Sequence, residues 1–162
     1  MNDLQDRVEW FKNAYRKFAE DLTDVNDWQY LENAAIYRKH TGNCDGAVEA
    51  MIKAISLTRT IPNLAEKTAT MLNYLADIYL DGNALGEAET AICEAVELSR
   101  PRFPSLLAAN LLVLAEIQML KGEHGEALAS SEEARHLYQQ EGHSHGVAQA
   151  KGLIERIKTK TE

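Results

Sequence analysis

Apolar residues recur at intervals of three and four along almost the whole chain, which is the spacing that places them on one side of an α-helix. Short polar segments containing Gly, Asn or Asp interrupt this spacing, and such segments are typical of turns between helices. With only three prolines and nine glycines in 162 residues, few positions break a helix. The pattern therefore predicts an all-α protein of about eight helices.

Small residues repeat along this pattern three times. Each repeat has an alanine in its first helix, a second alanine 12 residues later and a third 7 residues after that, and the repeats start 41 and then 39 residues apart. Small side chains on facing helices allow close approach, so each repeat predicts a tight antiparallel hairpin. The alanines are Ala35, Ala47 and Ala54, then Ala76, Ala88 and Ala95, then Ala115, Ala127 and Ala134.

A glycine lies in the turn between the two helices of each repeat, at Gly42, Gly82 and Gly122. Glycine adopts positive φ without steric cost, and this conformation commonly ends a helix. We therefore expect positive φ at these three positions.

The repeat resembles the tetratricopeptide repeat (TPR), in a variant of about 40 residues rather than the usual 34 or so. The nine alanines match the small positions of the family, Leu75 and Leu114 match its leucine, and Tyr79 matches its aromatic residue. Leucine replaces the tryptophan of the family, and the closing proline is displaced to Pro62 and Pro101. The resemblance covers Trp28 to about Gly142 and implies an α-solenoid of stacked hairpins that form a superhelix.

The repeats divide the chain into three parts. We expect an N-terminal helix in residues 1–26, repeats over 27–142, and a C-terminal capping helix in 143–162. The three repeats span about 28–62, 63–103 and 104–142. The N-terminal helix, about Leu4 to Leu22, is in register with the second half of a preceding repeat, so it is either an end cap or part of a longer protein.

The C-terminal helix is expected from Val147 to Lys160. Its apolar residues Leu153, Ile154 and Ile157 share one side, which we expect to face inward. Its lysines suit a helix C-terminus and a solvated outer face.

The charge of the chain excludes some partners. Asp and Glu number 25 and Lys and Arg 17, which gives −8 and argues against binding of nucleic acid or of anionic membranes. Polar residues interrupt the most apolar stretch, Leu106 to Leu120, so a core helix is favoured over a membrane span. The N-terminal residues have no signal-peptide pattern, and the two cysteines form no CxxC motif. We expect reduced thiols and a cytoplasmic location.

Candidate chemistry is sparse. His143 and His145 are too few to bind a structural metal ion, and Asp45 near Cys44 is more readily explained as the N-cap of the next helix than as part of a nucleophilic site. Cys93 is expected to be inert packing within a helix. We therefore predict no catalytic site, no metal site and no cofactor.

The resemblance implies that the first helix of each repeat lines a concave, partner-binding face. Asparagines there can hold a peptide backbone, Tyr74 offers a flat anchor, and Asp77 and Glu116 attract a basic side chain. The alternative is that Leu112, Val113 and Met119 are buried under the last helix. The predicted face consists of Asn33, Ile36, Asn73, Tyr74, Asp77, Leu112, Val113, Glu116 and Met119.

These features predict a non-enzymatic protein-interaction module, a scaffold for a peptide or protein with apolar anchors and a basic residue. The alternative is a ligand- or peptide-sensing regulatory domain of a larger transcriptional regulator or signalling protein. A dimer through the N-terminal helix, which carries Trp10 and Phe11, is left open.

Overall fold

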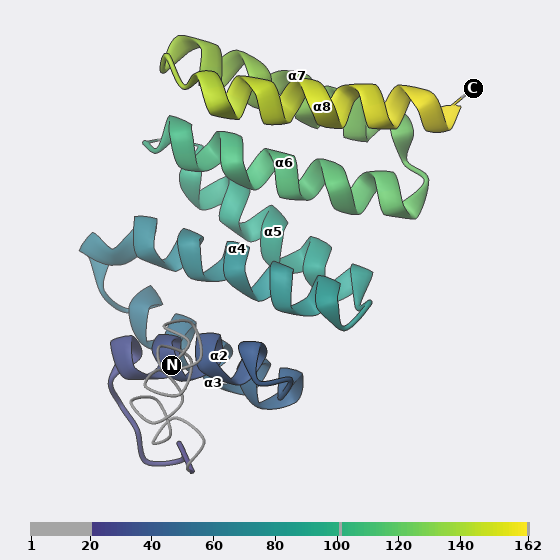
Figure 1. Cartoon of the computed structure of the whole chain (residues 1–162). Helices are drawn as coiled ribbons and strands as arrows, with labels where there is room; N and C mark the ends of the chain where they lie inside the picture. The colour runs from purple at the N-terminus through teal and green to yellow at the C-terminus, as the bar shows by residue number, and fades with distance from the viewer. Residues whose placement is uncertain (1–20, 101, 162) are drawn as a thin grey trace, which may run out of the picture. The chain divides into compact units, whose positions relative to one another are not determined.

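The computed structural model describes residues 21–100 and 102–161. Every regular element within these ranges is a helix: seven α-helices, α2 to α8, and one short 3₁₀ helix (Figure 1). This confirms the predicted all-α fold of stacked hairpins. The chain divides into two compact units, Met1–Thr60 (unit 1) and Ile61–Glu162 (unit 2), and each is described by itself. The predicted N-terminal helix, the aromatic residues Trp10 and Phe11, and Pro101 lie outside the described residues.

The helices described in unit 1 are α2 (Trp28–His40) and α3 (Cys44–Arg59), which pack against each other as a hairpin. The N-cap of α3 is Asn43, whose Oδ1 accepts a hydrogen bond from the Gly46 amide at 3.0 Å. The prediction that Asp45 caps this helix is therefore wrong, because α3 begins two residues earlier than expected. Asp45 lies in the first turn, where a negative charge favours the helix dipole.

The described residues of unit 2 form a stack of five α-helices. A 3₁₀ helix (Pro62–Leu64) leads into α4, and each helix packs against the next along the chain, with α6 also contacting α4 and α8 (Figure 1). Thus α4 with α5 and α6 with α7 form two antiparallel hairpins, and α8 covers the end of the second. The helices are α4 (Ala65–Asp81), α5 (Leu85–Ser99), α6 (Pro104–Lys121), α7 (His124–Gln140) and α8 (Ser144–Thr161).

The alanines of the repeat lie between the paired helices. All nine have no solvent exposure, although they come from six different helices. A side chain larger than alanine at these positions would force the helices apart, so the repeat in sequence is a repeat in packing. The hairpins predicted from the alanine spacing are confirmed.

The left-handed turn residue follows the register of the repeat rather than the position of glycine. Gly42 and Gly122 have φ of +83°, whereas Gly82 has φ of −83° and the neighbouring Asn83 has φ of +56°. Asn83 lies seven residues after its repeat's first alanine, as do Gly42 and Gly122. The expectation for Gly82 was therefore wrong, because asparagine also tolerates this conformation.

The most apolar helix, α6, lies inside unit 2. Its length and composition would suffice to cross a membrane, but its apolar residues form two core clusters with α5, α7 and α8. Leu107 and Leu111 pack against α5 and α7 in one cluster, and Ala115 packs against α7 and α8 in the other. This arrangement supports the prediction of a core helix.

The last helix, α8, faces inward as predicted, with Leu153, Ile154 and Ile157 buried. It begins at Ser144, three residues before the expected start. The reason is a local cap: His143 Nδ1 accepts a hydrogen bond from the Gly146 amide at 3.1 Å. Gly146 also lies directly beneath the Tyr138 ring, where a Cβ atom would meet ring carbons at 2.6 Å.

Candidate functional site

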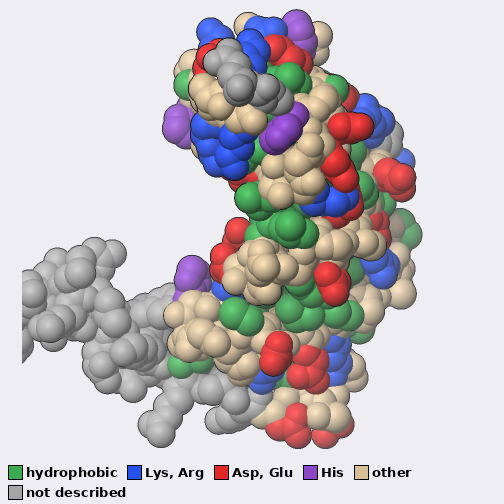
Figure 2. All heavy atoms as spheres, turned by 90° about the vertical axis from the view of Figure 1, so that its right-hand side faces the viewer, with side chains coloured by type: hydrophobic (Ala, Val, Ile, Leu, Met, Phe, Trp, Pro, Cys, Tyr) green, Lys and Arg blue, Asp and Glu red, His purple; other side chains and the backbone are tan. Residues whose placement is uncertain are grey.

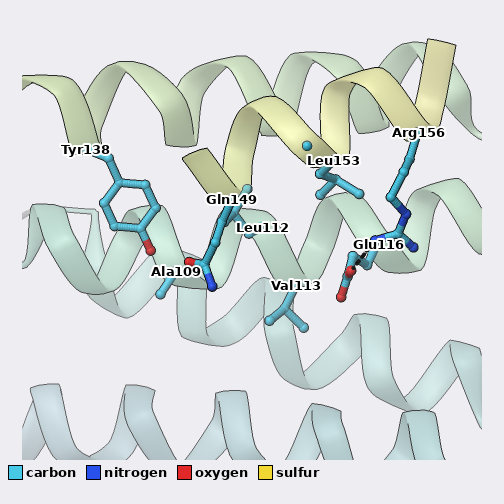
Figure 3. Close-up of a pocket in the computed structure, with 9 residues that line it drawn as sticks. Ala109, Leu112, Val113, Glu116, Tyr138, Gln149, Leu153 and Arg156 are labelled. Carbon is cyan, nitrogen blue, oxygen red and sulfur yellow. Dashed lines mark hydrogen bonds and ion pairs between the residues drawn. The ribbon is translucent and has the colours of Figure 1, made fainter. Parts of the chain in front are cut away.

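A pocket opens between α6 and α8 in unit 2. Its volume is about 490 Å³, within the range of about 300–1,000 Å³ typical of ligand pockets. Figure 3 shows α8 on one side of the pocket, α6 on the other, and Tyr138 of α7 at one end. The lining residues are Ala109, Leu112, Val113, Glu116, Tyr138, Gln149, Gly152, Leu153 and Arg156.

The two walls of the pocket come from equivalent positions of α6 and α8. Each helix contributes residues at positions i, i+3, i+4 and i+7, which form one side of a helix, and the two sets are 40 residues apart. The pairs are Ala109 with Gln149, Leu112 with Gly152, Val113 with Leu153, and Glu116 with Arg156. The same stripe on α4, 39 residues before that of α6, is Thr70, Asn73, Tyr74 and Asp77.

The floor of the pocket is apolar and rigidly supported. Leu112 is half-buried and packs against both core clusters of unit 2. Leu153 belongs to the cluster that joins α6, α7 and α8 and is buried. Because well-packed cores hold their side chains in fixed rotamers, this surface keeps its shape without a ligand.

Gly152 leaves the wall of α8 open. It occupies the position equivalent to Leu112, and a Cβ atom at Gly152 would have no described heavy atom within 4 Å. Glycine inside a helix destabilises it by about 0.5–1 kcal/mol relative to alanine. The packing of the described residues gives no reason for this glycine, and the space that a side chain would fill belongs to the pocket.

One end of the pocket carries opposite charges. Arg156 Nη1 lies 3.3 Å from Glu116 Oε1, and the two side chains are 61% and 44% exposed. An exposed pair of this kind contributes about 0–1 kcal/mol to stability. It can therefore open at small cost when another charged group competes for either partner.

The other end of the pocket carries neutral polar groups. The Tyr138 ring extends from α7 with its hydroxyl toward the end lined by Ala109 and Gln149 (Figure 3). Burial raises the pKa of the Tyr138 hydroxyl above its ordinary value, so the group is neutral at physiological pH and both donates and accepts hydrogen bonds. The exposed amide of Gln149 offers a further donor and acceptor.

The structure places three of the predicted site residues in this pocket: Leu112, Val113 and Glu116. Met119 does not join them. It is buried at 4% exposure in the core cluster of α6, α7 and α8, so its assignment to the binding face was wrong. The alternative prediction, that these residues are buried under the last helix, is correct for Met119, because α7 and α8 cover that turn of α6. Leu112 and Val113 are only half-buried.

The predicted residues of α4 are half-buried, and Asn73 has an internal partner. Its Nδ2 donates a hydrogen bond of 2.8 Å to Asn110 Oδ1. Asn110 is fully buried, and its own Nδ2 donates to Ala95 O at 3.1 Å and to Ser99 Oγ at 2.9 Å. This network joins α4, α5 and α6, so Asn73 positions these helices, a role that the sequence did not suggest.

The remaining predicted residues, Asn33 and Ile36, lie on α2 in unit 1, exposed and half-buried respectively. A smaller pocket of about 180 Å³ lies elsewhere in this unit, where Lys53 Nζ donates to Leu22 O at 2.9 Å. Neither Asn33 nor Ile36 lines it. Its residues are Leu22, Thr23, Leu31, Arg38, Glu49, Ala50 and Lys53.

The pocket residues that the sequence analysis missed are Ala109, Tyr138, Gln149, Gly152, Leu153 and Arg156. Four of them lie on α8, which was interpreted as a cap. The signal that could have found them is the 40-residue offset between α6 and α8, because it extends the first-helix stripe of the repeats to a further helix. Tyr138 has no such signal, since it comes from the second helix of its hairpin.

The surface beyond the pocket is mixed. In the view of Figure 2, acidic and basic side chains are interspersed and hydrophobic side chains reach the surface in small groups. The large hydrophobic residues most exposed in the described part of the chain are Ile52, Ile61 and Leu120. Ile52 lies on α3, Ile61 directly precedes the 3₁₀ helix, and Leu120 lies in the last turn of α6.

Metal and thiol chemistry gain no support from the geometry. Among the described residues, His, Cys, Asp and Glu form no group of three or more that could hold a metal ion. Cys93 is exposed on α5 rather than packed as expected. Partial burial, followed by the carboxylates of Glu89 and Glu97, raises the pKa of the Cys93 thiol, which disfavours the reactive thiolate.

Solved structures with similar folds are TPR-type helical repeats. The apo form of RapI matches 96% of this chain with a TM-score of 0.82 and 15% identity. MamA matches 99% with a TM-score of 0.62 and 18% identity, over 98% of its own length. The TPR-like repeats of a kinesin light chain from Podosopora anserina match 98%, over 88% of their own length, with a TM-score of 0.57 and 19% identity.

These likenesses establish the fold as a TPR-type helical repeat. The chain spans 45% of the length of RapI, so it corresponds to less than half of that protein. No protein-family model and no curated protein matches the sequence.

Proposed function

We propose that this chain is a non-enzymatic protein-interaction module that holds a peptide segment of a partner protein on the face formed by α4, α6 and α8. The observation that carries the proposal is the pocket between α6 and α8, whose apolar floor is flanked by neutral polar groups at one end and charged groups at the other. Apolar anchoring with a few polar groups at fixed positions is how pockets bind extended segments selectively.

The chemistry of this face favours a partner segment with apolar anchors and a basic residue. The two carboxylates Asp77 and Glu116 occupy equivalent positions on α4 and α6. Tyr74 and Val113 lie one turn earlier on the same helices, where they provide a flat and a branched apolar surface. A partner segment with a basic side chain beside the carboxylates and an apolar side chain beside Tyr74 and Val113 would match the chemistry of both groups.

Selection of peptides from a random library displayed on phage tests this proposal without knowledge of the natural partner. We expect selected peptides to combine an apolar residue with Lys or Arg. The double substitution Tyr74→Ala and Asp77→Asn should weaken a selected peptide at least tenfold, about 1.4 kcal/mol, in calorimetric titration. Asn73 is left intact because its substitution would disturb the Asn110 network.

The matched control is Glu97→Gln, which removes one carboxylate from the exposed surface of α5. It should bind a selected peptide as the parent does. Unchanged melting temperatures of both variants show that the loss is one of binding. Failure to select any peptide, or equal affinity of the double variant and the parent, would overturn the proposal.

A second candidate function is a peptide- or ligand-sensing regulatory part of a larger protein. The correspondence of this chain to 45% of RapI favours it. An immunoblot of the native host, with an antibody raised against this chain, measures the mass of the protein that contains it. A band far above 18.1 kDa supports this alternative, and a band at 18.1 kDa contradicts it.

A further inference from the structure

The position of Arg156 indicates which kind of partner segment the proposed binding face holds. Along the equivalent stripes of α4, α6 and α8, one turn holds Asp77, Glu116 and Arg156. Two of the three are carboxylates, and the third is a guanidinium that spans the pocket to contact Glu116 at 3.3 Å. The arrangement resembles a basic ligand bound at an acidic site, except that the cation belongs to the protein itself.

The space beside this pair is built for a large side chain. Gly152 lies one turn before Arg156 on α8, and a side chain at Gly152 would meet open space. Leu112 on the opposite helix and Leu153 beside Gly152 on α8 provide an apolar floor. An apolar side chain entering here would cover the glycine, and the residue next to it in the partner would reach the charged end of the pocket.

We propose that the pocket binds a partner segment in which a bulky apolar residue covers Gly152 and an adjacent Lys or Arg replaces Arg156 beside Glu116. This inference rests on the proposed function. A basic residue is favoured over an acidic one because the equivalent positions of α4, α6 and α8 carry two carboxylates, Asp77 and Glu116, and one cation, Arg156. Arg156 is therefore an internal competitor, held by an exposed pair that separates easily.

Two sets of fluorescein-labelled, amidated octapeptides test the proposal. In one set Leu, Phe or Trp precedes Arg at the centre of the peptide, and in the other set the same residues precede Glu. Fluorescence polarisation with the full chain measures their affinities. We expect the Arg peptides to bind at least about fivefold more tightly than the Glu peptides, a difference typical of complementary charges at an exposed site.

Three variants separate the contributions of Arg156, Glu116 and Gly152 to peptide binding. Arg156→Ala should tighten the Arg peptides about threefold or more and weaken the Glu peptides, because the competitor is gone and, with it, the one Lys or Arg among the described residues that line the pocket. Glu116→Gln should weaken the Arg peptides. Gly152→Leu should weaken both sets about tenfold or more, because its side chain fills the pocket.

Matched controls keep the result specific. Lys158→Ala removes a cation from the exposed side of α8, where it pairs with Glu155 outside the pocket, and it should leave both sets unchanged. Gly86→Leu adds the same side chain at an exposed glycine of α5 with open space around it. It should also bind as the parent does, and circular dichroism checks that every variant is folded.

The outcomes distinguish this inference from the proposed function. If Arg156→Ala weakens the Arg peptides as much as Glu116→Gln does, Arg156 is a ligand-binding group and the inference is wrong. If phage-selected peptides depend on Tyr74 and Asp77 but not on Gly152, the proposed function stands and the inference fails. If no selected peptide binds at all, both fail.

Discussion

Asn73 on α4 and Asn110 on α6 are joined by a side-chain hydrogen bond of 2.8 Å, although they are 37 residues apart in sequence. Asn110 lies on a fully buried position of the most apolar helix in unit 2, where three of its hydrogen-bonding positions are occupied. A buried polar group is tolerated only when it is satisfied. The pair therefore fixes the relative position of two helices that form the candidate binding face.

Substitution of Asn110 should destabilise unit 2. Asn110→Ala removes an acceptor for Asn73 and a donor for Ser99 and Ala95, and we expect a loss of about 1–3 kcal/mol in urea unfolding. Asn73→Ala should cost less, because Asn73 is half-buried and water replaces its partner. Equal stability of Asn110→Ala and the parent would show that the network makes no net contribution.

The close approach of the hairpin helices is tested on α7. Ala127 has no exposure, whereas Ala129, two residues later, is exposed. Ala127→Glu places an unpaired charge between α6 and α7, so we expect a loss of about 3 kcal/mol or more and a reduced helical signal in circular dichroism. Ala129→Glu makes the same chemical change at the surface and should shift the melting temperature little. Similar melting of the two variants would mean that the alanine register is wrong.

Gly146 is required by the packing of Tyr138 rather than by its backbone. A Cβ atom there would lie 2.6 Å from carbons of the Tyr138 ring, and the ring also contacts His143, with centroids 5.2 Å apart. Gly146→Ala should therefore lower stability by about 1–3 kcal/mol. Gly86→Ala, at a helical glycine with no neighbour within 4 Å, should be neutral or raise stability by up to about 1 kcal/mol. The melting temperature should fall for Gly146→Ala and stay the same or rise for Gly86→Ala, and a Gly146→Ala protein as stable as the parent would contradict this packing.

Stability should fall at alkaline pH. Burial raises the pKa of Tyr138 above 10.0, and hydrogen bonds to Glu123 and Glu89 raise the pKa of Lys121 above 10.5. Both groups hold their protons more tightly in the folded state, so their contribution is complete below the unfolded pKa values and is lost as pH rises through the folded values. Urea midpoints measured between pH 8 and 11 should decline above about pH 10.

Tyr138→Phe isolates one of these contributions. The variant removes the titrating hydroxyl but keeps the ring that packs on Gly146. Its midpoint should decline less steeply above pH 10 than that of the parent. An identical decline would assign the whole effect to other groups, Lys121 among them.

The sequence predicted the fold well because the relevant signals are local. Apolar residues at helical spacing determine which side of each helix is buried, and alanines at fixed separations determine which turns approach each other. The nine buried alanines and the inward residues Leu153, Ile154 and Ile157 follow directly from these two patterns. The left-handed residue Asn83 also obeys the repeat register, although its neighbour Gly82 concealed it.

The candidate site was predicted only in part, because a binding surface depends on which helix covers which. The resemblance to the tetratricopeptide repeat implied Leu112, Val113 and Glu116 as residues of the binding face, but it also implied Met119, which α7 and α8 cover. The hydrogen bond between Asn73 and Asn110 could not be predicted from the sequence, because it joins two polar residues on helices that are far apart along the chain.

The sequence by itself determined the helices, their pairing into hairpins and the side of each helix that is buried, because these depend on spacing along the chain. Only the tertiary structure decided that α8 lies beside α6 at a distance that leaves a pocket over Gly152 and lets Arg156 reach Glu116. The physical reason is that a pocket is defined by the space between side chains of different helices. That space depends on how each helix is rotated and covered, which no spacing within a single helix specifies.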